Sequence, residues 1–209
     1  MVEKSAWSGR VTSVQPRIRL TRSFDESTHS YLGYWLFIDG VIDGQPCEFS
    51  IGIGKGAHHK HQFRVGDEVR GESLPVPDER QEPVEFYKTS KLKILKRLEE
   101  GVTSPPPWHG VPPDLETYRA RGHRRWSTRT YESRCTSCIW GCRMSMVIIV
   151  DHWQPQNKRY RYETFCYGPK SCRLYKPGPR RRVPGRRGMV WEEPDWVDEQ
   201  ATAHRGPDE

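Results

Sequence analysis

Residues 7–97 contain short stretches in which apolar and polar side chains alternate, separated by turn-forming residues. Alternation with a period of two is typical of strands that bury one face. No stretch here has the period of a long helix, so this part of the chain is predicted to be mainly β. The expected strands are Trp7–Ile18, Tyr31–Ile42, Gln45–Ile53, one that begins at Glu68 and continues through Ser73, and Val84–Leu95.

A second alternating pattern lies in the C-terminal half. Met144–Trp153 is apolar and β-branched, Gln154–Asn157 supplies turn residues, and Arg159–Phe165 alternates again. This pattern indicates a β-hairpin. A short helix is expected at Leu115–Arg125, with Asp114 as its N-cap.

The first five strands resemble an OB-fold barrel. The resemblance covers about 90 residues and depends on the strand number, a glycine-rich middle and the turn Phe63-Arg-Val-Gly-Asp-Glu-Val-Arg-Gly71. It implies a sheet face that binds single-stranded nucleic acid or oligosaccharide, and it makes Tyr34 and Trp35 candidates for stacking on bases. Trp35 and Phe37 share one face at strand period, however, so they are alternatively part of the barrel core.

Charge is distributed unevenly along the chain. The net charge is +7, but residues 1–116 balance to −2, residues 117–190 carry 18 basic and 3 acidic side chains, a balance of +15, and residues 191–209 balance to −6. The expected organisation is therefore an OB-like barrel at 1–100, a Pro-rich linker at 101–116, a basic Cys-rich module at 117–190 and an acidic tail at 191–209. A basic block of this density favours a polyanion, most obviously nucleic acid, as the partner.

The basic module supplies the candidate nucleic-acid contacts. They are Arg124, Arg125, Lys170, Arg173, Tyr175, Lys176, Arg180, Arg181, Arg182, Arg186 and Arg187. Arginine suits phosphate because of its planar fork of donors, and tyrosine offers a stacking face. The alternatives are a solvated basic surface and one that the acidic tail folds back to mask. A further alternative is that the tail docks a protein partner through its two tryptophans.

Five cysteines in this module have the spacing of metal ligands. They are arranged as Cys135-x2-Cys138-x3-Cys142 and Cys166-x5-Cys172. Cys142 lies about as far before the predicted hairpin turn as Cys166 lies after it, so strand pairing is expected to bring these two together. The favoured ligands are Cys135, Cys138, Cys142 and Cys166, with Cys172 able to replace any of them. Cys47 stands apart and is expected to be buried as a small apolar residue.

Zinc is the favoured metal, since a Cys-x2-Cys turn joined to a hairpin resembles a zinc ribbon. A [4Fe-4S] cluster is the alternative, since three close cysteines and one remote cysteine also suit a cubane. No catalytic constellation is recognisable in the sequence. The expected function is thus binding of single-stranded RNA or DNA with a structural four-cysteine site. The alternative is an iron–sulfur redox or enzyme-accessory protein.

Membrane insertion is not expected. No apolar run approaches the roughly 20 residues needed to span a bilayer, and Met1–Ser8 lacks the apolar stretch of a signal peptide. A cytoplasmic location is therefore expected, where cysteines stay reduced. His58, His59 and His61 are expected in a polar loop after a glycine-rich stretch that lacks the ending of a P-loop.

Overall fold

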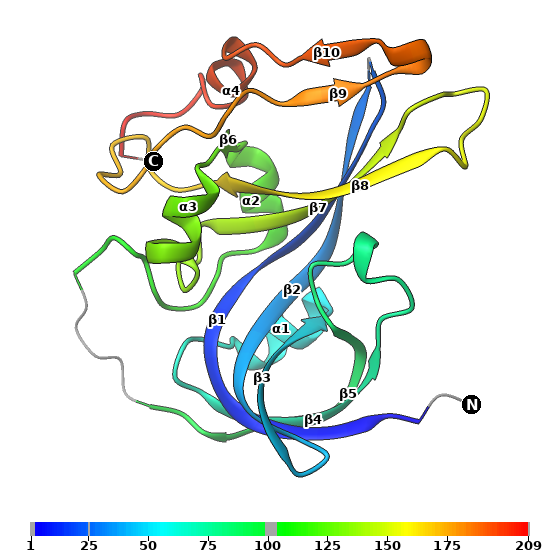
Figure 1. Ribbon diagram of the computed structural model, residues 1–209. Helices are drawn as coiled ribbons and strands as arrows, with labels where there is room; N and C mark the ends of the chain where they lie inside the picture. The colour runs from blue at the N-terminus through cyan, green and yellow to red at the C-terminus, as the bar shows by residue number, and fades with distance from the viewer. Residues whose placement is uncertain (1–2, 25, 99–103, 209) are drawn as a thin grey trace.

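The computed structural model describes residues 3–24, 26–98 and 104–208, so the first residues of the expected linker, 101–103, lie outside it. The described chain is mainly β, as predicted, and one large sheet dominates it (Figure 1). Within these ranges eight strands pair in the order β2-β3-β5-β4-β1-β7-β8-β6, and β1 also pairs with β2. No helix in the described part of the chain has the length and apolar content that a membrane span needs.

The elements have the following bounds. The strands of the large sheet are β1 (Ser5–Arg22), β2 (Ser27–Ile42), β3 (Gln45–Ile53), β4 (Glu68–Pro75), β5 (Phe86–Lys96), β6 (Arg124–Arg125), β7 (Gly141–Ile149) and β8 (Lys158–Cys166). A separate two-stranded ladder consists of β9 (Arg182–Pro184) and β10 (Val190–Glu192). The helices are α1 (Lys55–His61), η1 (Glu79–Gln81), α2 (Leu115–Arg121), α3 (Thr128–Thr130), η2 (Tyr131–Cys135), η3 (Arg186–Gly188) and α4 (Trp196–Ala201).

The long strand β1 connects the two halves of the molecule (Figure 1). Its first part, Ser5–Arg10, pairs with β4, and its last part, Arg19–Arg22, pairs in parallel with β7. Pro16 lies between these two stretches and faces a ladder partner only on β2. A proline, which lacks an N–H donor, is tolerated there because no strand pairs with β1 on its other side at that point.

The pairings of the first five strands run β1–β2–β3–β5–β4 and return to β1. The β3–β5 link is a single parallel pair, Ile51 with Phe86. Asp43 and Gly44 form the two-residue turn between β2 and β3, and both have positive φ. A two-residue turn with positive φ at both positions matches the twist of the flanking strands and so favours a tight hairpin. Gly9 and Gly40 face each other across β1 and β2, and a Cβ on Gly40 would lie 2.1 Å from a backbone oxygen.

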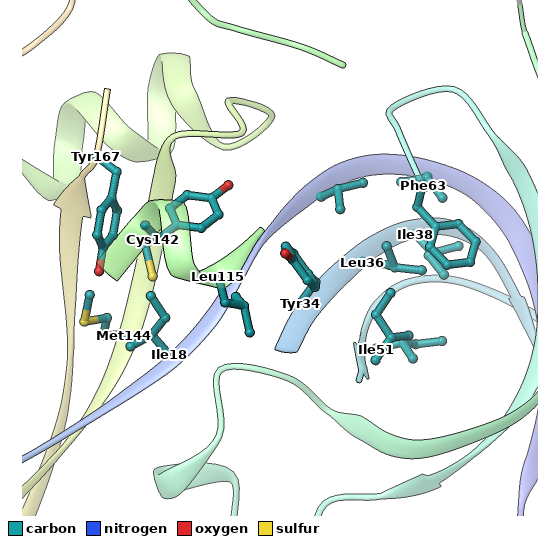
Figure 2. Packing of buried hydrophobic residues seen from close by; sticks show 14 of the residues in the cluster. Ile18, Tyr34, Leu36, Ile38, Ile51, Phe63, Leu115, Cys142, Met144 and Tyr167 are labelled. Atoms are coloured by element: carbon teal, nitrogen blue, oxygen red, sulfur yellow. The ribbon is translucent and has the colours of Figure 1, made fainter. Parts of the chain in front are cut away.

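One apolar core extends through both halves. Side chains from β1, β2 and β3, such as Leu36 and Ile51, continue into a group that includes Cys142, Met144 and Tyr167 (Figure 2). Because the core is continuous, the two halves stabilise each other, and the module at 117–190 packs against β1 rather than standing apart.

The structure corrects three local expectations. The residues after Gly54 form the helix α1 instead of a loop, and His58 is buried, with its ring centroid 3.8 Å from that of Tyr34. Cys47 is exposed rather than buried, since it lies near the hairpin end of β3, beyond the core. The strand expected to reach Trp153 ends at Ile149.

The described part of the linker lies along the molecule as a strap. Tyr34 donates its hydroxyl to the carbonyl of Pro113 at 2.7 Å, and a ring nitrogen of His58 lies 3.1 Å from the carbonyl oxygen of Pro112. Trp108 packs beside the cysteines, and its carbonyl accepts from the N–H of Ile139. Asp114 is at the N-cap of α2 but makes no side-chain capping bond.

Candidate metal centre and nucleic-acid interface

The register of the β7–β8 hairpin separates the two cysteines that were expected to meet. Gly141 lies opposite Cys166, so Cys142 lies opposite Phe165. Successive side chains of a strand point to opposite faces, so this offset of one residue sends the two thiols to different sides of the sheet. Cys142 joins the main core (Figure 2), whereas Cys166 joins a second cluster with Cys135 and Cys138.

The surroundings of Cys142 suit a neutral thiol. Its Sγ donates to the carbonyl of Pro16 at 3.4 Å, and the side chain is fully buried. Burial raises the pKa of Cys142 well above its ordinary value. A thiol that donates to a carbonyl is held in its protonated form, and only the thiolate is a metal ligand. The sequence-based choice of Cys142 as a favoured ligand therefore does not fit its position.

The other four cysteines of the module gather on the opposite side of the hairpin. Burial raises the pKa of Cys135 to about 12, and the nearby Cys138, Cys166 and Cys172 raise it further because thiolates would repel one another. Cys166 and Cys172 act on Cys138 in the same way. Cys172, which was expected to be the spare, thus lies with the group, and Cys142 does not. All six cysteines of the chain are free thiols.

Backbone N–H groups point toward two of these sulfurs. Burial raises the pKa of Cys138 to about 12, and hydrogen bonds from the N–H groups of Trp140 and Trp108 oppose this rise. Burial also raises the pKa of Cys166, opposed by the N–H of Gly168 and by Arg124. Donors of this kind stabilise a thiolate. In both cases one donor lies two residues after the cysteine, as expected of a tight turn around a ligand.

Gln15 on β1 fixes the Cys135–Cys138 turn. Its amide donates to the carbonyls of Thr136 and Cys138, both at 2.9 Å, while its own oxygen accepts from the hydroxyl of Tyr131 at 2.6 Å. The side chain is fully buried. The sequence carries no signal for this role, because a glutamine inside a strand does not reveal what it contacts 120 residues later.

The four thiols lie near one another but do not have the arrangement of a formed metal site. Across residues 3–24, 26–98 and 104–208, no three cysteine, histidine, aspartate or glutamate side chains are arranged so that they already form a metal-holding group. The donor chemistry, four clustered sulfurs with N–H groups directed at two of them, nonetheless suits a soft metal ion.

The acidic tail folds back over the basic module. Of the arrangements considered from the sequence, this is the one in which the tail masks the basic surface. Arg181, which is buried, contacts Glu193 at 2.8 Å, Asp198 at 3.2 Å and Glu163 at 3.3 Å. Arg125, also buried, contacts Asp198 at 2.6 Å and pairs with Asp195. Arg22, also buried, lies 3.3 Å from Glu193. We call the carboxylates Glu193, Asp195 and Asp198 with the guanidinium groups Arg22, Arg125 and Arg181 the tail clamp.

The tail clamp also acts on a histidine. Burial and the charges of Arg181 and Arg22 lower the pKa of His29 to about 4, against the smaller opposing effect of Glu193. The neighbouring His123, whose ring lies 4.9 Å away, has its pKa lowered by burial, by His29 and by the same two arginines. The neutral form of both imidazoles is therefore favoured in the folded protein.

Stability is expected to fall as the pH falls from about 6.5 to about 4. In this window the unfolded chain protonates His29 and the folded chain does not, so acid favours unfolding. Urea denaturation at pH 7.5 and pH 5 measures the effect, and His29→Gln should reduce the difference between the two midpoints. An identical pH dependence in the variant would contradict the assignment.

Several predicted phosphate contacts are already engaged. Arg125 and Arg181 are buried in the tail clamp, and Arg180 pairs with Asp195 at 2.9 Å. Arg186 lies 3.6 Å from Asp151, and Lys170 donates to the carbonyl of Arg205 at 3.1 Å. These side chains hold the tail and the C-terminal loops in place.

The predicted aromatic contacts are engaged as well. Tyr34 is buried under the linker, so it is not available for stacking on a base. Arg124 stacks on Tyr175 with 3.8 Å from its guanidinium carbon to the ring centroid, and Tyr175 donates to the carbonyl of Arg125. Trp35 is 7% exposed. The most exposed large aromatic of the described residues is Trp153, at 82%.

A group of basic side chains remains exposed. Among the described residues no carboxylate pairs with Arg134, Arg173, Lys176, Arg182 or Arg187. Arg134 and Arg173 line one pocket, whose other walls are Pro106, Pro107 and Leu174. Each of these two arginines is adjacent in sequence to a clustered cysteine, Arg134 to Cys135 and Arg173 to Cys172.

Comparisons with known proteins give no guide to this site. No protein-family model matches the chain, and no curated protein or solved structure matches it significantly.

Proposed function

We propose that this chain is a nucleic-acid-binding protein whose basic surface is organised by one zinc ion bound to Cys135, Cys138, Cys166 and Cys172. The observation that carries the proposal is the adjacency of the exposed arginines to the clustered cysteines. A metal that fixes the cysteines also fixes the backbone from which Arg134 and Arg173 extend.

Four thiolates make a closed tetrahedral site, which is the usual form of structural zinc. The ligands come from the end of η2, the turn that follows it, the end of β8 and the loop after β8. Zinc would therefore join these segments through their side chains, while Gln15 ties the first of them to β1. The ion's role is structural, and no catalytic step is assigned to it.

The nucleic acid is bound through phosphates. Arg134 and Arg173 flank an apolar floor, and an arginine fork matches the geometry of a phosphate oxygen pair. Trp153 takes the base-stacking role that was first expected of Tyr34 and Trp35, since its ring is exposed and stacking favours unpaired bases. The cyclic pairing of β1 to β5 supports an OB-like barrel as the platform of the module.

Salt dependence tests the phosphate contacts. Replacing both arginines, as Arg134→Gln/Arg173→Gln, is expected to weaken binding of a labelled single-stranded RNA about tenfold. The slope of log K against log salt should fall by about 1.4, or about 0.7 for each phosphate that is no longer neutralised. Fluorescence anisotropy between about 50 mM and 300 mM salt measures both quantities.

The matched control is Arg10→Gln/Arg70→Gln, which removes the same charge from the β1–β4 ladder. Both of its arginines are exposed. Equal losses of affinity in the two variants would show that binding depends on total charge and not on the pocket lined by Arg134 and Arg173. Affinity that stays flat with salt in the unaltered protein would reject nucleic-acid binding altogether.

A further inference from the structure

An acidic, aromatic groove lies between the β2–β3 face and the C-terminal module. Its volume is about 600 Å³. Trp35 and Phe37 from β2 form one wall, and their rings meet edge to face at 6.2 Å. Tyr131 and Glu132, which precede the clustered cysteines, contribute to the opposite wall. The groove exists only because the two halves of the chain pack together.

The groove carries unpaired negative charge although the whole chain is basic. Four of its carboxylates, Glu48, Glu79, Glu85 and Glu132, have no basic partner among the described residues. Of these, Glu85 accepts from the N–H of Ser50 at 2.7 Å, which fixes it in place. These charges repel phosphate, so the groove is separate from the proposed nucleic-acid surface.

The basic side chains near the groove are too few to balance its glutamates. Glu82, the fifth glutamate of the lining, pairs with Arg17 and Arg19. Arg143 is the basic side chain in the lining, and its guanidinium carbon lies 4.5 Å from the ring centroid of Tyr162. Arg143 keeps its charge in this contact, but five glutamates against one basic side chain leave the lining net negative, which favours an external cation.

A buried donor adds a second requirement. Trp35 lines the groove and is more than nine-tenths buried, at 7% exposure, and its indole N–H has no acceptor among the described residues. A buried N–H without an acceptor is unfavourable, because it has given up its hydrogen bond to water. The N–H is covered in this structure, so a ligand acceptor reaches it only after the Trp35 ring turns toward the groove; a complementary ligand carries such an acceptor as well as positive charge.

We propose that this groove binds an extended peptide segment rich in arginine or lysine, supplied by a partner protein. Such a segment offers cationic side chains to the glutamates, aliphatic stems to the aromatic wall and a main-chain carbonyl to the indole of Trp35. A polyamine supplies only donors, so it leaves the indole unpaired. An RNA strand brings phosphates against four carboxylates.

Peptide titrations test this assignment. The probe is a fluorescein-labelled peptide of alternating glycine and arginine, and the control probe has glutamate in place of arginine. Glu48→Gln/Glu132→Gln is expected to weaken binding of the arginine peptide about tenfold, because it removes two of the charges that attract the peptide. Trp35→Phe, which keeps an aromatic ring and removes the N–H, is expected to weaken it about fivefold.

The matched control is Glu116→Gln/Glu199→Gln, which removes two exposed carboxylates outside the groove lining. Its affinity for the arginine peptide should stay within about twofold of the unaltered protein, since distant surface charges act weakly. The proposal is overturned if this control loses as much as the groove variant, or if the arginine peptide does not bind. It is also overturned if spermine binds as tightly and Trp35→Phe changes nothing, which would make the groove a small-cation site. None of these outcomes depends on whether the arginine pocket binds RNA.

Discussion

Replacing Asp198 by asparagine is expected to destabilise the folded protein by about 3 kcal/mol, because it removes a carboxylate that compensates two buried guanidinium groups. Asp198 contacts both Arg125, at 2.6 Å, and Arg181, at 3.2 Å, and all three side chains are buried. Asparagine keeps the shape of the side chain but removes its charge. Urea denaturation of the metal-loaded protein measures the difference in the free energy of unfolding.

The neighbouring Glu199 provides the control, since it is exposed and belongs to the same helix α4. Glu199→Gln should change the free energy of unfolding by less than about 0.5 kcal/mol, as is usual for surface substitutions. A similarly small effect of Asp198→Asn would mean that the tail clamp contributes little, and that the tail lies on the basic module without stabilising it.

Removal of the metal is expected to lower the thermal midpoint by roughly 8 °C. A ligand at about 100 times its Kd stabilises the folded state by about 2.7 kcal/mol, and about 1 kcal/mol corresponds to roughly 3 °C in a chain of this length. Scanning calorimetry with and without a strong chelator measures the shift. It should be accompanied by faster hydrogen exchange at residues 131–142 and 166–175, whereas the β1–β2 ladder should stay protected.

Adding zinc back should restore the midpoint, and calcium should not, because thiolates select soft ions. A chelated protein that is shown to be free of metal and still melts at the original temperature would contradict a structural metal.

Strand positions could be predicted well from the sequence because alternation is a local signal. The β3 bounds Gln45–Ile53 agree with the structure, and both strands of the later hairpin were expected. Strand register has no comparable local signal, because it depends on which residues of two strands pair. The residue count around the hairpin turn placed Cys142 near Cys166, but pairing shifted by a single residue turns the Cys142 thiol into the core.

The basic module shows a second limit. Its charge density was evident in the sequence, but a count of arginines does not reveal which of them are already paired. Arg125 and Arg181 were expected to bind phosphate, and the structure gives both of them carboxylates from the tail. Contacts between segments 70 or more residues apart depend on the final packing, so they carry no local pattern.

The metal content of two cysteine variants tests the central claim most directly. Zinc and iron would be measured in anaerobically purified Cys142→Ala and Cys172→Ala, beside the unaltered protein. We expect about one zinc per chain in the unaltered protein and in Cys142→Ala, as in structural sites with four cysteine ligands, and loss of that zinc in Cys172→Ala. Retention by Cys172→Ala with loss in Cys142→Ala would contradict the ligand set, and about four irons with sulfide per chain would show the iron–sulfur alternative instead.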